Sequence, residues 1–427
     1  MDVLIIFLLM LVLFFLGAPI GFGILTGMVY YLFFTGQTME VYTVVSNVTL
    51  SSDSYVLVAV PFFMLAAELM NRSGITDRIF DFAKALVGHI PGGLGHVNVV
   101  ASMIFAGMSG SGMADTSGLG KVEIKAMKDA GYDPAFSAAV TASSGIIGPI
   151  IPPSICMVIG AVVTNTSVGR MLLGGALPGI FMGLALMVMV YILARRGNYP
   201  VLARASRAQC LARFRSSLPA LLTPLILVGG IVSGICTPTE AAVIACVYAL
   251  GLSCFLYRAF HFKSLFQVFV DTGKSAGALL FILAAASALG KIAVRSQIPQ
   301  KLALGLVQIT THPVGIMVII VAMLVVMGML MEDLSLLVIM GPLLMPVVTR
   351  VGIDPVHFGV VMVLTLQLAM ITPPVGVGFY IACYYAEVDM VRYARTAIWF
   401  FLALLLVVLV MVCVPEIVTL LPDLVFD

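Results

Sequence analysis

Two stretches of the chain interrupt apolar sequence in the same way and at the same spacing. Gly107 precedes Pro152 by 45 residues, and Gly328 precedes Pro373 by 45 residues. An Asp-Pro dipeptide recurs at the matching place in each stretch. In both copies, one apolar segment is interrupted by a loop rich in Gly, Met and acidic residues, and the next is interrupted by a Pro-Pro pair. We interpret the chain as a duplication.

The composition makes these interruptions informative. Hydrophobic residues form 61% of the chain, charged residues form 10%, and the mean hydropathy is +1.16. Such a chain is an integral membrane protein. Irregular backbone persists at membrane depth only where it is buried in protein or faces water. The sequence therefore predicts an all-α membrane protein in which two re-entrant helical hairpins and two broken helices line the binding site of a transporter.

Basic residues predict the orientation in the membrane. The apolar run from residue 3 to about 34 is too long for a cleaved signal peptide and is interpreted as the first spanning helix. The connector 195–216 contains no acidic residue, which together with its arginines places it in the cytoplasm. Those arginines are Arg195, Arg196, Arg204, Arg207, Arg213 and Arg215. The seven cysteines show no metal-ligand spacing and are interpreted as small core residues.

Tracing outward from this connector gives the two copies opposite orientations. The hairpin at 91–130 opens from the cytoplasm and the hairpin at 313–349 from the outside, because the helix at 217–234 has no counterpart in the first half. This arrangement is an inverted repeat. Segments 75–88 and 297–310 precede the hairpins and are interpreted as interfacial arms, with ordinary polar loops as the alternative.

Five regions are predicted from this tracing. They are 1–90, scaffold helices and an arm; 91–170, the first half of a transport domain; 171–312, scaffold helices with the basic connector and the second arm; 313–387, the second half of the transport domain; and 388–427, a C-terminal scaffold helix that spans 396–421.

The interruptions suggest how ions could be held. A broken helix exposes carbonyl oxygens that suit a hard cation, beside helix N-termini whose partial positive charge suits an anion. Asp115, Glu332 and Asp333 are the acids nearest the predicted centre, and each could ligate a cation, accept backbone hydrogen bonds or pair with a basic residue. Glu68 and Glu240 are interpreted as structural, and Glu240 as a helix cap.

Four segments carry a family resemblance. GMSGSGMADTSGLG, GPIIPPS, CTPTEAA and ITPPVGVG resemble the large membrane subunit of tripartite ATP-independent periplasmic (TRAP) transporters, over essentially the whole chain. The resemblance implies an elevator-type fold in the inner membrane of a bacterium, with about two Na⁺ ions carried alongside an organic acid such as sialic acid or a C4-dicarboxylate. It also implies a separate small four-helix membrane subunit and a periplasmic substrate-binding protein as partners.

The same resemblance implies ligands at named positions. One Na⁺ site is expected at Ser109, Gly110, Ser144, Gly145 and Gly148, and the other at Gly328, Thr365, Met370 and Thr372. The organic acid is expected between them, at Ser111, Gly112, Asp115, Pro149, Pro152, Glu332, Asp333, Thr372 and Pro373.

Other readings stay open at this point. A stand-alone sodium/dicarboxylate symporter would share the architecture without a binding protein. An intramembrane enzyme would need a catalytic motif, but His-Glu-x-x-His is missing. A non-transporting assembly subunit would not need duplicated helix breaks. A Walker A motif is absent, so no nucleotide is expected to drive transport, and no nucleic acid partner is expected.

Overall fold

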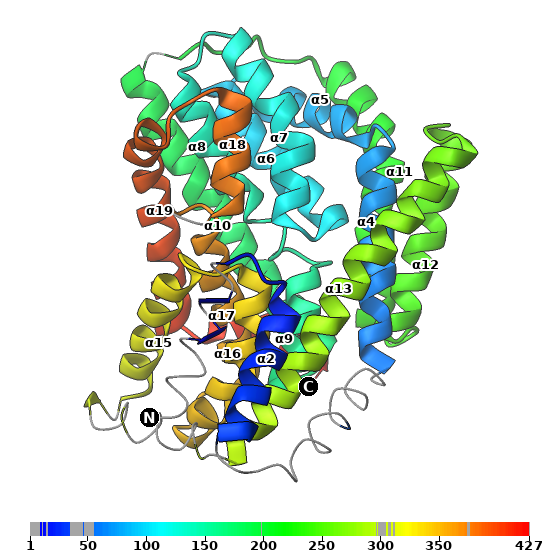
Figure 1. Cartoon of the computed structure of the whole chain (residues 1–427). Helices are drawn as coiled ribbons and strands as arrows, with labels where there is room; N and C mark the ends of the chain where they lie inside the picture. Colours follow the sequence, from blue (N-terminus) through cyan, green and yellow to red (C-terminus); the bar gives the residue numbers. More distant parts are fainter. Residues whose placement is uncertain are drawn as a thin grey trace.

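The structure is a computed structural model and is shown in Figure 1. It describes residues 9–10, 12–13, 16–34, 46, 55–197, 199–295, 297, 305, 309–310, 312–373 and 376–426. Every regular element within these ranges is a helix. Six of the described helices are long and apolar enough to cross a membrane. The prediction of an all-α, multi-pass membrane protein is therefore confirmed.

The first hairpin and the first broken helix have the predicted positions. The hairpin consists of α6 (Gly93–Ser109) and α7 (Gly112–Asp129), and the broken helix of α8 (Pro134–Gly145) and α9 (Ile155–Thr164). Asp133 starts α8 because its Oδ1 accepts hydrogen bonds from the backbone N–H groups of the second and third helical residues. Pro134 is suited to the first helical position, because a backbone N–H there would have no partner within the helix.

The second copy repeats this pattern. Its hairpin is formed by α15 (Pro313–Gly328) and α16 (Asp333–Arg350), and its broken helix by α17 (Pro355–Ala369) and α18 (Val377–Ala386). Asp354 caps α17 by accepting a hydrogen bond of 2.8 Å from the backbone of His357. Of the predicted Pro-Pro pair, Pro373 follows the end of α17, and Pro374 lies outside the described residues.

The remaining helices are α2 (Ile20–Phe34), α4 (Ala59–Arg72) after the short η1 (Tyr55–Val58), α5 (Ile75–Val87), α10 (Val168–Gly197), α11 (Arg207–Val232), α12 (Pro238–Gly251) with its extension η2 (Leu252–Leu256), α13 (Phe262–Arg295), α19 (Met390–Cys413) and α20 (Glu416–Phe426).

The helices pack into two groups (Figure 1). We call α2, α4 and α11–α13 the side bundle, and α6–α10 with α15–α20 the hairpin body. The predicted arm 75–88 is helical, as α5, and packs against both α6 and α11, so it connects the two groups. The predicted arm 297–310 lies outside the described residues except at isolated positions.

The predicted regions assign α10 and the C-terminal helices to the scaffold. In the structure, these helices pack against the helices of the hairpin body. The reason for α10 is a stripe of small residues that permits close approach. A Cβ atom added at Gly175 would lie 2.5 Å from the carbonyl oxygen of Ile150, and one added at Gly179 would lie 2.4 Å from the side chain of Ile151.

Two predicted helices are divided. The predicted helix 3–34 is interrupted before α2, where residues 16–19 are not helical and Gly17 has a φ of 85°. The predicted helix 396–421 is α19 followed by α20, because Pro415 between them has no N–H to continue the ladder. The prediction of a single C-terminal helix was therefore wrong.

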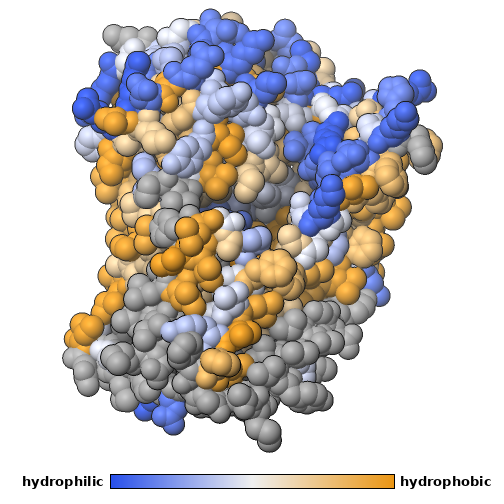
Figure 2. All heavy atoms as spheres, in the orientation of Figure 1, coloured by the Kyte–Doolittle hydropathy of each residue, from blue (hydrophilic) through white to orange (hydrophobic). Residues whose placement is uncertain are grey.

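Charged and apolar residues occupy different parts of the surface. Hydrophilic residues gather at one end of the molecule and apolar residues form a band below it (Figure 2). The end of α10, the start of α11 and the start of α19 lie at this hydrophilic end (Figure 1). The basic connector thus emerges there, and the positive-inside rule predicts that this end is cytoplasmic.

Candidate functional site

A cavity of about 550 Å³ lies between the hairpin body and the side bundle. It is lined by both hairpin tips, by both helix breaks and by one face each of α4 and α13. From the predicted site, the cavity includes Gly110, Ser111, Gly112, Pro149, Gly328, Glu332, Asp333 and Met370. The interruptions of the two copies, far apart in sequence, therefore meet in one place.

Four helix N-termini face this cavity. The first residues of α7, α9 and α16 line it, as do Gly376 and Val377 at the start of α18. Each N-terminus carries roughly half a positive charge and unpaired backbone N–H groups. Among the described lining residues, none is Lys, Arg or His. The groups in the lining that favour an anion are therefore backbone N–H groups, and the carboxyl groups of Glu68, Glu332 and Asp333 oppose them.

The tip of the first hairpin packs directly on the first break. Gly110 has a φ of 58°, and a Cβ atom there would lie 2.7 Å from the carbonyl oxygen of Pro153. A Cβ atom added at Gly112 would lie 2.9 Å from the carbonyl oxygen of Gly145. Gly148 also lies close to the tip, because its added Cβ would be 3.3 Å from the Ser111 carbonyl oxygen. Only residues without side chains permit this approach.

Hydroxyl groups of the predicted first Na⁺ site lie nearby. The Ser109 Oγ is buried and has no hydrogen-bond partner among the described residues. The Ser144 hydroxyl is engaged, since it donates to Asn98 Oδ1 at 2.6 Å and accepts from Ser102 at 3.1 Å. Ser109 thus offers a free oxygen, whereas Ser144 belongs to a polar network between α6 and α8. Asn98 and Ser102 are members of this network that sequence reasoning missed.

Asp115 is placed differently from the expectation for a substrate ligand. Its side chain is 1% exposed, lies on α7 one turn behind the hairpin tip, and is not among the residues that line the cavity. Neither carboxyl oxygen has a hydrogen-bond partner within the described residues. Pro152 also lies outside the cavity lining, whereas Pro149 contributes to it.

In the second copy, the two acids occupy a helix N-terminus. Glu332 precedes α16, and its carboxylate accepts a hydrogen bond of 2.9 Å from Ser335. Asp333 accepts a hydrogen bond of 2.7 Å from Gln367 Nε2 on α17. Gln367 was not singled out from the sequence, although it lies within the interrupted segment. It joins the tip of the second hairpin to the second helix break.

The other predicted residues of this half are spread along α17 and its end. Gly328 packs on Ala369, since an added Cβ would lie 2.5 Å from that side chain. The Thr372 hydroxyl donates to the carbonyl oxygen of Ala369 at 2.9 Å. Thr365 is fully buried and donates to the carbonyl oxygen of Val361. It lies about 7.5 Å along the helix axis from Met370. Thr365, Thr372 and Pro373 do not line the cavity.

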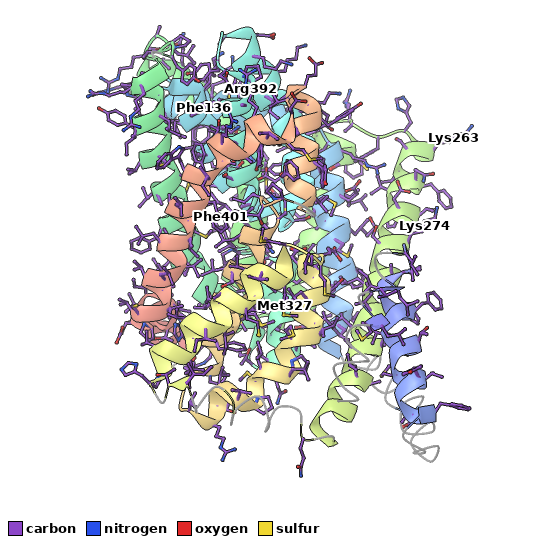
Figure 3. The ribbon with its side chains drawn as sticks, turned by 60° about the vertical axis from the view of Figure 1, so that its left-hand side comes forward. Phe136, Lys263, Lys274, Met327, Arg392 and Phe401 are labelled. Carbon is purple, nitrogen blue, oxygen red and sulfur yellow. The ribbon has the colours of Figure 1, made fainter. Side chains whose placement is uncertain are left out.

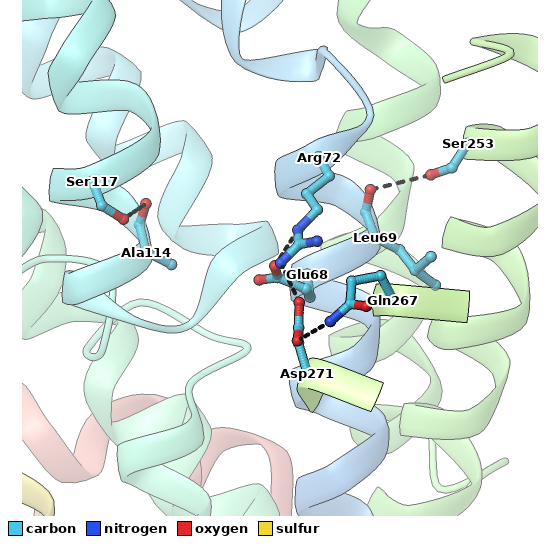
Figure 4. A network of polar contacts seen from close by, with 8 residues as sticks. All are labelled: Glu68, Leu69, Arg72, Ala114, Ser117, Ser253, Gln267 and Asp271. Atoms are coloured by element: carbon cyan, nitrogen blue, oxygen red, sulfur yellow. Dashed lines mark hydrogen bonds and ion pairs between the residues drawn. The ribbon is translucent and has the colours of Figure 1, made fainter. Parts of the chain in front are cut away.

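The side bundle contributes a charged network to the cavity wall (Figure 4). Arg72 on α4 pairs with Glu68 at 2.5 Å and with Asp271 on α13 at 3.0 Å. Gln267 donates to the other oxygen of Asp271 at 2.7 Å. Glu68 itself lines the cavity, so the interpretation of this residue as structural was incomplete. The prediction that Glu240 caps a helix is confirmed by its hydrogen bond of 2.8 Å from the backbone N–H of Thr237.

Comparisons with known proteins agree with this architecture. Residues 7–417 match the family model described as "Tripartite ATP-independent periplasmic transporter, DctM component". The chain is 40% identical over 410 residues to the sialic acid TRAP transporter large permease protein SiaM of Vibrio cholerae, covering 96% of each protein. It is 36% identical over 373 residues to the C4-dicarboxylate TRAP transporter large permease protein DctM of Pseudomonas aeruginosa, covering 87% of each.

Among solved structures, the YdaH transporter of Alcanivorax borkumensis has the same fold, with a TM-score of 0.65 and 15% identity over 89% of this chain and 88% of that one. These two curated relatives are named as transporter permeases and not as enzymes. The chain therefore belongs to the family of DctM components, the large permease proteins of tripartite ATP-independent periplasmic transporters.

Proposed function

We propose that this chain is the membrane subunit that takes up an organic acid with Na⁺, and that a periplasmic substrate-binding protein delivers the acid. The observation that carries this proposal is the set of four helix N-termini around one cavity that has no basic lining residue among those described. A carboxylate is the ligand that such N–H groups and partial charges favour. Relatives named for sialic acid and for C4-dicarboxylates support an acid as the substrate class.

Sodium coupling is supported by the helix ends that meet the same cavity. Gly110, Gly328 and Met370 lie where α6, α15 and α17 end, and helix C-termini present carbonyl oxygens without intrahelical partners. Carbonyl and hydroxyl oxygens are suitable ligands for a hard cation. About two Na⁺ ions would bind, one at the tip of each hairpin, so that the bound cations offset the charge of the acid.

An elevator mechanism is supported by the division into two groups of helices. The first hairpin lies in the upper half of Figure 1 and the second hairpin in the lower half, as an inverted repeat requires. In the proposed mechanism, the hairpin body carries acid and Na⁺ past the side bundle. A separate small membrane subunit would enlarge the fixed side, in the bacterial inner membrane.

Uptake into proteoliposomes tests this function. The chain would be reconstituted with its small membrane partner, and uptake of radiolabelled acids would be measured with an inward Na⁺ gradient, with and without the periplasmic protein. We expect uptake that requires both. Uptake with Na⁺ alone would support a stand-alone symporter instead. Equal uptake from a K⁺ gradient would refute sodium coupling.

A further inference from the structure

A second cavity lies at the basic end of the hairpin body. It has a volume of about 340 Å³ and lies where α8 begins, beside α10, the following connector and α19. Its lining includes Asp133 and Phe136 from the start of α8, Leu193 and Tyr199 from α10 and the connector, and Arg392 and Arg395 from α19. Figure 3 shows Phe136 and Arg392 together at this end of the molecule. The proposed transport cycle does not use this cavity.

The charge of this cavity is positive overall. Asp133 forms an ion pair with Arg392, whose side chain remains 59% exposed. The other carboxylate oxygen of Asp133 is occupied by two backbone N–H groups of α8. Arg395 lies three residues further along α19 and forms no ion pair with a described acidic residue. Arg395 thus has no neutralising acid among the described residues, and the paired Arg392 remains largely exposed.

The hydroxyl group of Tyr199 is a further hydrogen-bond donor in this cavity. Tyr199 stacks on Tyr132 with ring centroids 4.6 Å apart and an interplanar angle of 15°. Burial, and then the charge of Asp133, raise the pKa of the Tyr199 phenol. The phenol therefore stays protonated at neutral pH and can donate a hydrogen bond. Two guanidinium groups and a phenol form a donor set that matches the oxygens of a phosphate group.

An apolar surface continues from this donor set along the hairpin body. On α10, Val188 and Ile192 are 59% and 41% exposed, and on α19, Trp399 and Leu402 are 48% and 47% exposed. The two helices pack against each other. Both helices are long and apolar enough to cross a membrane, so these exposed side chains would contact acyl chains in a bilayer.

We propose that this cavity binds the phosphate group of an anionic phospholipid from the cytoplasmic leaflet. Basic pockets between membrane helices on this side are suited to anionic head groups. Asp133 both caps α8 and pairs with Arg392, so the bound phosphate would share with Asp133 a guanidinium that links the first broken helix to α19. The ligand is a phosphodiester with acyl chains, and free phosphate shares only its head-group chemistry.

Native mass spectrometry in detergent, with the chain and its small membrane partner purified together, tests this site. A short-chain phosphatidylglycerol would be titrated, with phosphatidylcholine and inorganic phosphate in separate arms. The variant Arg395→Gln should bind phosphatidylglycerol about fivefold more weakly, the change expected for one basic group near an anionic head group. Lys263→Gln is the matched control, because Lys263 lies at the same end on α13 of the side bundle (Figure 3) and should leave binding unchanged.

The outcomes separate the possible ligands. Arg395→Lys should restore part of the affinity because it restores the charge, and thermal unfolding of each variant checks that the fold is intact. An equal loss in Lys263→Gln would show a diffuse surface effect and overturn the proposal. Binding of inorganic phosphate without any preference for phosphatidylglycerol over phosphatidylcholine would overturn the lipid assignment.

Discussion

At the scale of single residues, the site depends on the absence of side chains. Gly110 and Gly112 let the first hairpin tip approach the backbone of the first break to within contact distance. Backbone N–H and C=O groups therefore face the cavity from the hairpin body, together with the side chains of Ser111, Glu332 and Asp333. Side-chain identity matters most where it positions these groups, as Gln367 does by holding Asp333.

Substituting Gly110 with alanine tests this dependence. Gly110→Ala places a Cβ atom 2.7 Å from Pro153 in a left-handed conformation, so we expect uptake to fall strongly. Gly131→Ala is the matched control, because Gly131 has a φ of 84° and no atom within 4 Å of an added Cβ. Both variants should lose about 1–2 kcal/mol from backbone strain. Uptake and thermal unfolding would be measured for both variants. Equal uptake in the two would argue against a close-packed tip.

Sequence reasoning predicted the residue types of the site better than their contacts. The Gly, Ser and Pro residues of the breaks stand out because the interruptions recur at the same spacing in both copies. The hydrogen bonds of Ser144 with Asn98 and of Asp333 with Gln367 join residues 46 and 34 positions apart. Such pairs depend on how helices pack, which local sequence does not specify. For the same reason Asp115 was expected in the cavity and lies behind it.

At the scale of the elements, the breaks are defined by caps. Ser154 starts α9 by accepting a hydrogen bond of 3.1 Å from the backbone N–H of Met157, and its hydroxyl donates to the carbonyl oxygen of Pro149. One side chain thus fixes both sides of the first break. These boundaries were predictable because Asp-Pro and Pro-Pro steps restrict the backbone locally. The packing of α10 was not predicted, although glycines at every fourth position from Gly175 indicate a helix contact.

Removing this cap should affect function more than stability alone explains. Ser154→Ala is expected to cost about 1 kcal/mol of stability and to weaken uptake, because the N-terminus of α9 lines the cavity. Ser206→Ala is the matched control, since Ser206 caps α11 in the exposed connector, away from the cavity. Thermal unfolding and the Michaelis constant for the acid would be measured for both. A Michaelis constant that changes equally in the two variants would contradict the assignment of α9 to the site.

At the scale of the whole molecule, the proposed elevator mechanism requires the hairpin body to move against the side bundle. The two groups contact each other directly, and one such contact joins Gly118 of α7 to Asn71 of α4. A Cβ atom added at Gly118 would lie 3.3 Å from the Cγ atom of Asn71. Cysteines at these two positions would therefore be within reach of a disulfide bond, whose Cβ atoms lie about 3.5–4.5 Å apart.

The most direct test of this movement is uptake by the double variant Asn71→Cys/Gly118→Cys, in a background without the seven native cysteines. Oxidation should abolish uptake and a reducing agent should restore it, with the cross-link confirmed by peptide mass spectrometry. The control pair Gly160→Cys/Val363→Cys joins α9 to α17 within the hairpin body and should leave uptake unchanged when oxidised. Full uptake by the cross-linked Asn71/Gly118 pair would contradict movement of the hairpin body past the side bundle.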